Sequence, residues 1–306
     1  RHLARCMRKN NDADGALAAL RQALELSANH LGVVTDLTNH LTNVGDFDQA
    51  DRVIRELPAG RTSARVLALD LFSELYWRGN PAAAVAAVTG WPSWFMADDR
   101  GAGHAALAAL WNRNPVRAQK ILTSFPRDYL RDYLFTGPRA VLSAWANEQA
   151  GNGEAAQADW KIALQTSERI LGEFPDDREA LYWKAWALAR LGDRPGATAL
   201  LRLLEQREAR SNGMFFFGGL AGLKAALGDI EGAVDLLANV RVDLVLNIKP
   251  PTKAFLRLNP VFDPLRNNPR FQALIAAAPG PEEKKEVGAA SAIPPEKSVA
   301  VLAFAN

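Results

Sequence analysis

The chain has 306 residues, of which 48% are hydrophobic and 23% charged, a composition that excludes a wholly disordered protein. Its 36 basic and 34 acidic residues leave a net charge of +2, too small to favour nucleic-acid or membrane-surface binding by field alone. No run approaches 18 apolar residues, so no transmembrane helix is predicted. The single cysteine, Cys6, cannot form an internal disulfide, which fits a cytoplasmic protein.

A six-residue block recurs along the chain. All seven copies have Asp or Asn second and Ala last: NDADGA at 11–16, GDFDQA at 45–50, GNPAAA at 79–84, RNPVRA at 113–118, GNGEAA at 151–156, GDRPGA at 192–197 and GDIEGA at 228–233. The closing alanines are 34, 34, 34, 38, 41 and 36 residues apart. Three identical spacings in succession indicate an internal repeat.

Each block predicts a turn between two antiparallel helices. Gly, which begins five of the blocks, can adopt the left-handed conformation that ends a helix, and Asp or Asn then caps the next one. Pro81 and Pro115 follow their capping Asn at the first helical position, and Asp46 with Gln49 fits a capping box. We expect the closing Ala to lie where the two helices cross, because a larger side chain would force them apart.

The period resembles that of the tetratricopeptide repeat family, whose 34-residue unit consists of two helices, over residues 1–240. The resemblance lies in spacing more than in side chains, since the family's Trp-Leu-Gly-Tyr pattern is largely absent. It implies an all-α fold, a right-handed superhelical solenoid of about seven helix hairpins with a concave groove and a short C-terminal capping segment. Residues 127–138 stretch the fifth repeat and are expected to form a longer loop or a helix extension.

The repeat rhythm stops after Val240. Residues 255–275 resemble the closing segment of repeat arrays in bacterial multidomain regulators, among them serine/threonine kinases, adenylate cyclases and winged-helix transcription regulators. We expect residues 241–278 to cap the array and residues 279–297, rich in Pro, Ala, Gly, Glu and Lys, to be a linker. Residues 298–306 are similar to the first strand of a TolB amino-terminal-like domain, so the chain is expected to be a piece of a longer protein.

Motifs of catalysis, metal binding and cofactor binding are not found. GNGEAA matches the G-x-G-x-x-A dinucleotide fingerprint, but the residues before it read as a helix where the fingerprint needs a strand. The pattern NxDxDG at 10–15 begins like a calcium loop, yet Arg21 stands where a bidentate Glu is needed. The four histidines show no ligand spacing with each other or with Cys6. The sequence therefore predicts a protein that is not an enzyme and has no cofactor or metal.

The concave groove is the candidate site. The resemblance places groove residues on the first helix of each repeat, and its offsets fall here on Arg5, Lys9, Asn39, Asn43, Tyr76, Trp77, Trp111, Trp145, Gln149, Trp186 and Arg190. Trp and Arg offer large contact areas and directed hydrogen bonds to a peptide. The alternative is that these tryptophans pack between neighbouring first helices, as we expect for Trp91, Trp160 and Trp183. Arg5 and Lys9 either contact a phosphate or acidic peptide or belong to a solvated helix face.

The resulting hypothesis is a non-catalytic scaffold that binds a peptide or protein in its groove, as the regulatory part of a larger bacterial signalling protein. The alternative is self-association, or an intramolecular regulatory module of a kinase or cyclase. The near-neutral charge and Glu148 in the groove speak against a nucleic-acid partner.

Overall fold

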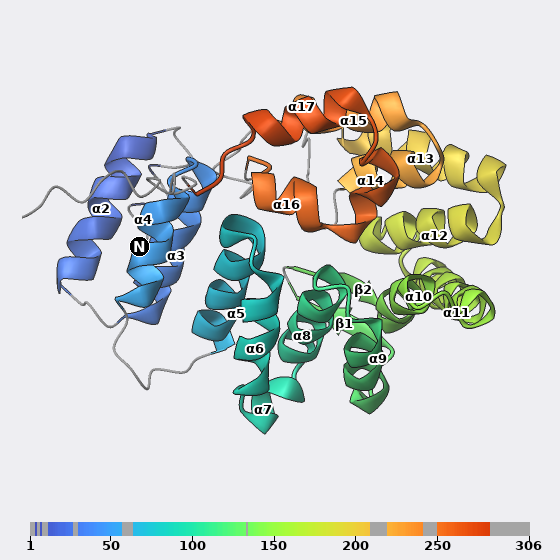
Figure 1. Ribbon diagram of the computed structural model, residues 1–306, viewed down its shortest axis with the longest axis horizontal. Coiled ribbons are helices and arrows are strands. Elements are labelled where there is room, and N and C mark those ends of the chain that lie inside the picture. The colour runs from blue at the N-terminus through green and yellow to red at the C-terminus, as the bar shows by residue number, and fades with distance from the viewer. Residues whose placement is uncertain are drawn as a thin grey trace, which may run out of the picture.

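The computed structural model describes residues 4, 7, 12–26, 30–56, 64–132, 134–208, 219–240 and 250–281. Within these ranges helices follow one another in consecutive antiparallel pairs, which confirms the predicted all-α, tetratricopeptide-like architecture. The chain passes along an arc from α2 to α12 and then turns back above that arc, so that its last helices lie over its middle (Figure 1).

The elements follow the predicted repeats closely. The hairpins comprise α2 (Ala13–Leu26), α3 (Leu31–Asn43) with α4 (Phe47–Arg55), α5 (Ala64–Phe72) and the π-helical turn η1 (Ser73–Arg78) with α6 (Pro81–Thr89), α8 (Asp99–Trp111) with α9 (Pro115–Ser124), α10 (Arg139–Gln149) with α11 (Gly153–Glu173), α12 (Arg178–Leu191) with α13 (Arg194–Glu208), and α14 (Gly219–Ala226) with α15 (Ile230–Ala238). The short α7 (Ser93–Met96) joins two hairpins, and α16 (Lys253–Leu258), η2 (Pro260–Leu265) and α17 (Pro269–Ala277) follow the last one.

The six-residue blocks form the hairpin turns as predicted. In six of the seven, the second residue accepts a hydrogen bond from the backbone N–H three residues later, at 2.8–3.1 Å: Asp12, Asp46, Asn80, Asn114, Asp193 and Asp229. The seventh, Asn152, makes no such bond. All five block-opening glycines have positive φ, and Arg113 adopts the same left-handed conformation (φ 54°) in the block that lacks Gly.

The capping box expected at the second block forms only in part. The Gln49 N–H donates to the Asp46 carboxylate, but the Gln49 side chain turns away and its Oε1 accepts a 2.7 Å hydrogen bond from Arg21. Because Arg21 lies on α2, this bond links the first two hairpins instead of closing the cap.

The closing alanines are buried, as expected for residues at helix crossings. All seven are between 0 and 4% exposed: Ala16, Ala50, Ala84, Ala118, Ala156, Ala197 and Ala233. A methyl group is therefore the largest side chain that these crossings accept without separating the helices.

The insertion at 127–138 holds a β-hairpin, so the expected loop or helix extension was wrong. Strands β1 (Tyr129–Arg131) and β2 (Thr136–Pro138) pair antiparallel, with Leu130 opposite Gly137. The hairpin is fixed from outside, because the Trp183 indole N–H donates to the Thr136 carbonyl at 2.6 Å. A Cβ at position 137 would lie 2.2 Å from that indole nitrogen, so only glycine allows the approach.

The buried apolar side chains of the described residues form two cores. The smaller one joins the first two hairpins through Ala4, Ala16, Leu20, Leu37, Leu41 and Ala50. The larger one extends from Phe47 and the third hairpin to Ile275 and includes every later hairpin.

Residues 250–281, which we call the C-terminal strap, belong to the larger core. The strap contributes five fully buried apolar side chains to this core: Phe255, Leu256, Phe262, Leu265 and Phe271. The strap packs on α14 and α15, which precede it, and also on η1, about 175 residues earlier in the chain. It therefore covers the last hairpin and also closes the arc back onto the third.

Candidate functional site

The N-terminal groove residues lie on or before α3. Arg5 and Lys9 fall outside the described residues. Asn39 is half-buried, whereas Asn43 is only 1% exposed, and neither amide atom of Asn43 has a hydrogen-bond partner within the described ranges. Since α3 carries both asparagines, this helix presents polar groups where the later first helices present tryptophan.

The central groove residues lie under the chain's own strap. Tyr76 and Trp111 are 2% exposed, and the Phe255 ring of α16 lies 5.1 Å from the Tyr76 ring and 6.0 Å from the Trp111 ring. The Tyr76 hydroxyl donates to the Pro250 carbonyl at 2.9 Å, and the Thr252 hydroxyl donates to the Tyr76 carbonyl. These two predicted contact residues are brought together, and their partner in this structure is part of the same chain.

Trp77 points toward the preceding hairpin. Its ring stacks on Phe47 at 4.6 Å and its indole N–H donates to Asp48 at 2.9 Å. Trp77 is only 6% exposed, so in this structure it packs between neighbouring hairpins.

Four tryptophans form one buried group, the tryptophan cluster, made of Trp145, Trp160, Trp183 and Trp186. The contacting rings have centroids 5.7–6.5 Å apart, and every member is at most 7% exposed. Trp160 and Trp183 were expected in the core, and Trp145 and Trp186 join them there. The packing interpretation, left open by the sequence, therefore describes all four in this structure.

A polar edge borders the tryptophan cluster where α10 and α12 end. Gln149 donates to the Leu110 carbonyl at 3.2 Å, and its Oε1 has no partner in the part of the chain described. The Arg190 guanidinium lies 5.5 Å over the Trp186 ring, and its Nε is 3.6 Å from Glu148, beyond hydrogen-bond distance. The Trp186 indole N–H also lacks a partner among the described residues. The structure thus gathers predicted residues of two hairpins, with three buried polar atoms left without a hydrogen-bond partner among the described residues.

A buried ionic group ties α8 to the β-hairpin. Asp132 accepts hydrogen bonds from His104 Nε2 at 2.6 Å and from Arg100 Nε at 2.7 Å. Burial acts to raise the pKa of Asp132, but the hydrogen bonds from His104, Arg100 and the Leu134 N–H outweigh it and lower that pKa to about 2. Burial lowers the pKa of His104, so the imidazole is neutral at physiological pH. With His104 at 0% exposed, this group anchors the hairpin and offers no surface to a substrate.

A second ionic group joins the second and third hairpins. Asp51 accepts from the Ser73 hydroxyl at 2.6 Å and pairs with Arg78, which also pairs with Glu74. Burial raises the pKa of Glu74, and Arg78 opposes this shift. The interface between these hairpins therefore combines this polar group with the stacked rings of Phe47 and Trp77.

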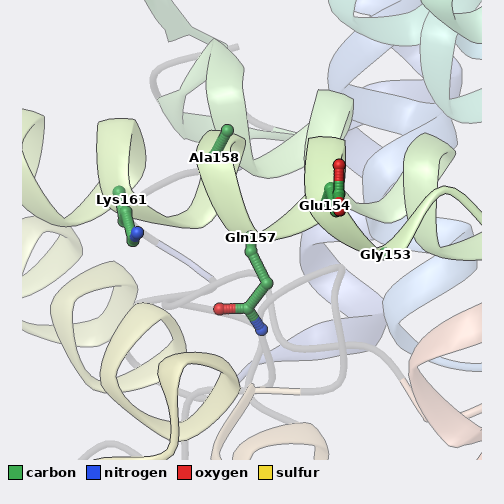
Figure 2. Close-up of a pocket in the computed structure, with 5 residues that line it drawn as sticks. All are labelled: Gly153, Glu154, Gln157, Ala158 and Lys161. Atoms are coloured by element: carbon green, nitrogen blue, oxygen red, sulfur yellow. The ribbon is translucent and has the colours of Figure 1, made fainter.

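A shallow depression lies on the exposed face of α11. Figure 2 shows Gly153, Glu154, Gln157, Ala158 and Lys161 following one side of this helix. Gln157 reaches from it to donate to the Arg190 carbonyl at 3.1 Å. The depression is open to solvent, with Glu154 and Lys161 a helix turn or more apart, so it lacks converging groups for chemistry.

Among the described residues, no group of three or more His, Cys, Asp or Glu side chains could hold a metal ion. No helix in the same ranges combines the length and the apolar character needed to cross a membrane.

The strap contacts were missed by sequence reasoning. Arg113 makes a bidentate pair with Asp263, at 2.6 Å for both bonds, across 150 residues. The one signal was the proline-broken segment at 255–275, which predicts a compact closing element but carries no information on where it docks.

Paired helices and buried closing alanines form an all-α array of hairpins that resembles tetratricopeptide repeats. Residues 7–70 match the family model described as "Tetratricopeptide repeat". The chain is also similar to the crystal structure of a tetratricopeptide repeat protein from Parabacteroides merdae ATCC 43184, with 15% identity, 78% of this chain and 89% of that chain covered, and a TM-score of 0.48. The comparison with curated proteins gave no match.

Proposed function

We propose that this chain is a non-catalytic scaffold that binds a peptide or protein segment along the first helices of its hairpins. The tetratricopeptide repeat is a unit that mediates protein contacts and is typically non-catalytic, and residues 7–70 carry its signature. The proposal extends this role to the whole array and needs no cofactor.

The polar edge of α10 and α12 carries this proposal. Gln149, Trp186 and Arg190 leave one acceptor and two donors without hydrogen-bond partners within the described ranges. Buried polar atoms without partners are costly, and the main chain of a peptide supplies both donors and acceptors. Arg190 over the Trp186 ring adds the type of residue pair that dominates binding energy at interfaces.

A second candidate is an intramolecular regulatory module, and the strap is the observation that favours it. Tyr76 and Trp111, two residues of the proposed groove, already contact Phe255 of the same chain. A repeat array that binds its own C-terminal segment can also bind another copy or an adjoining domain.

The larger context is part of the proposal. We assign residues 1–240 to the repeat array, 241–278 to its capping segment, 279–297 to a linker and 298–306 to the first strand of a TolB-like domain. Residues 282–306 lie outside the described residues. This order fits the regulatory arm of a bacterial cytoplasmic signalling protein of the kinase, cyclase or winged-helix type.

The test is a peptide-display selection against the whole chain. Enriched peptides are expected to lose about tenfold or more in affinity with Arg190→Ala or Gln149→Ala, because an interface hydrogen bond to a charged or buried group contributes about 1.5–3 kcal/mol. Lys161→Ala, on the exposed face of α11, is the matched control and leaves affinity unchanged. Failure to enrich any peptide, or equal losses in the control, would contradict the proposal.

A further inference from the structure

One short helix of the strap, α16, covers the aromatic residues Tyr76 and Trp111 of the proposed groove. Thr252, Ala254, Phe255 and Leu256, at the start of α16 and within it, are at most 6% exposed. A Cβ at Gly79, in the turn of the third hairpin, would lie 3.2 Å from Ala254 Cβ, so helix and turn are in close contact.

The contact has the chemistry of a bound peptide. An aromatic ring is held by Tyr76 and Trp111, and a hydroxyl and a carbonyl of the segment pair with Tyr76. An acid just after the helix, Asp263, pairs with Arg113. Each group that a foreign ligand would need there is supplied by the strap.

We propose that α16 is a built-in occupant of the wall formed by Tyr76 and Trp111, and that a partner reaching this wall must displace it. The inference rests on the proposed function, because it describes how one part of the proposed groove is regulated. The displacing segment would present an aromatic residue to Tyr76 and Trp111, while Arg113 stays paired with Asp263 of η2.

The strap is built so that α16 can leave while the remainder stays. Asn259 separates α16 from η2, which begins at Pro260 and packs on α14. Farther on, Arg270 of α17 pairs with Glu231 and Asp235 of α15 at 2.5 and 2.6 Å. These contacts hold the second half of the strap on the last hairpin whether or not α16 is seated.

The free energy needed to release α16 determines how strongly the seated helix weakens the binding of a partner. Releasing α16 exposes Phe255 and Leu256, both 0% exposed when it is seated, and separates Phe255 from Phe262 of η2. It also breaks the hydrogen bonds from Arg266 to the Leu256 carbonyl and from the Lys253 N–H to the Pro279 carbonyl. Burial of two such side chains corresponds to an open fraction of roughly 10⁻² to 10⁻⁴, and the apparent affinity of a competing partner falls by the same factor. Seating of α16 is thus expected to weaken binding about a hundredfold or more.

Hydrogen exchange on the whole wild-type chain tests the opening. The amides of 253–258 are expected to exchange at least tenfold faster than those of α12, through an opening that leaves α12 and α14 protected. Equal protection of α16 and α12 would overturn the proposal, because α16 would then open only when the array unfolds.

A peptide added in trans tests the competition directly. The probe is a fluorescein-labelled peptide of residues 250–259, and its binding to the whole chain is read by anisotropy. Phe255→Ala, which removes the seated ring, is expected to bind the probe at least tenfold more tightly than wild type. Thr252→Val, which removes the hydroxyl bonded to Tyr76 and to the Phe255 N–H, is expected to act in the same direction without leaving a large cavity.

Phe271→Ala is the matched control. Phe271 is also a 0% exposed phenylalanine of the strap, but its ring packs on Phe262 of η2, within the half of the strap that stays. Probe binding that is unchanged in both Phe255→Ala and Thr252→Val, or raised equally in Phe271→Ala, would overturn the proposal.

The two proposals fail in different ways. Peptide display against Phe255→Ala and wild type tests the proposed function, and enrichment from neither chain would contradict it. The anisotropy and exchange measurements use the chain's own segment and need no foreign partner. They therefore test whether α16 occupies and leaves its site even if no peptide is enriched.

Discussion

Gly192 ends α12 with a φ of 93°, and a Cβ added there would meet nothing within 4 Å. Backbone strain alone therefore opposes a side chain. Gly192→Ala is expected to lower the free energy of unfolding by about 1 kcal/mol, because left-handed backbone costs an L-residue about 1–2 kcal/mol. Thermal and urea unfolding would measure the loss.

Gly172 provides the control for this prediction. A Cβ added at Gly172 would likewise meet nothing within 4 Å, but this residue lies in helical backbone near the end of α11. Gly172→Ala is expected to stabilise the protein by up to about 0.5 kcal/mol, since Ala favours helix over Gly. Loss of stability of equal size in both variants would contradict the assignment of strain to φ.

Ala84 tests the helix crossings at the same scale. Ala84 is 0% exposed at the crossing of α6, whereas Ala86 in the same helix faces solvent. Ala84→Leu is expected to cost about 1–3 kcal/mol through overpacking, and Ala86→Leu to change stability by less than about 0.5 kcal/mol. Equal melting temperatures for the two variants would show that the crossing tolerates a larger side chain.

At the scale of elements, the hairpin turns could be predicted because their determinants are local. Asp46 caps a helix whose first residues follow it directly, and Gly45 turns the chain beside it. The β-hairpin at 129–138 could not, because each strand has three residues and its fixing bond comes from Trp183, about fifty residues away. Site residues could be placed on helices, but burial of Trp111 depends on Phe255, which no repeat offset connects to it.

His104 offers a pH test of how the β-hairpin is anchored. Its pKa is lowered by burial, so below about pH 6.5 the unfolded chain takes up a proton that the folded chain does not. Stability therefore falls as pH decreases through this range, by at most about 1.4 kcal/mol per pH unit for one proton. His104→Gln, which can still donate to Asp132, is expected to flatten this dependence between pH 7.5 and 5.5.

Asp132 affects stability in a lower pH range than His104, so the two contributions can be measured separately. Its folded pKa of about 2 lies below the ordinary 3.8, so its contribution is present above about pH 4 and is lost as pH falls toward 2. His104→Gln that kept the full wild-type slope between pH 7.5 and 5.5 would place the pH dependence elsewhere in the molecule.

At the scale of the whole molecule, the closed arc and the two apolar cores predict uneven stability. The strap joins the third hairpin to the last, so the hairpins of the larger core support one another around the arc. The first two hairpins share a smaller core and meet the third through Phe47, which stacks on Trp77, and through the polar group of Asp51, Ser73 and Arg78. The smaller core makes limited apolar contact with the larger one, through Phe47, so we expect the two cores to be weakly coupled.

Leu20→Ala and Leu107→Ala are a matched pair for this asymmetry, because both side chains are at most 1% exposed and lie in different cores. Each is expected to cost about 2–5 kcal/mol where it acts. Leu20→Ala should speed hydrogen exchange in α2, α3 and α4 and leave α10–α15 unchanged, since local openings stay within cooperative units. Leu107→Ala should speed exchange from α5 through α15, because the closed arc unfolds as one unit, and leave α16 unchanged, because α16 exchanges through its own local opening. Uniform acceleration along the chain by Leu20→Ala would instead require the two cores to unfold together.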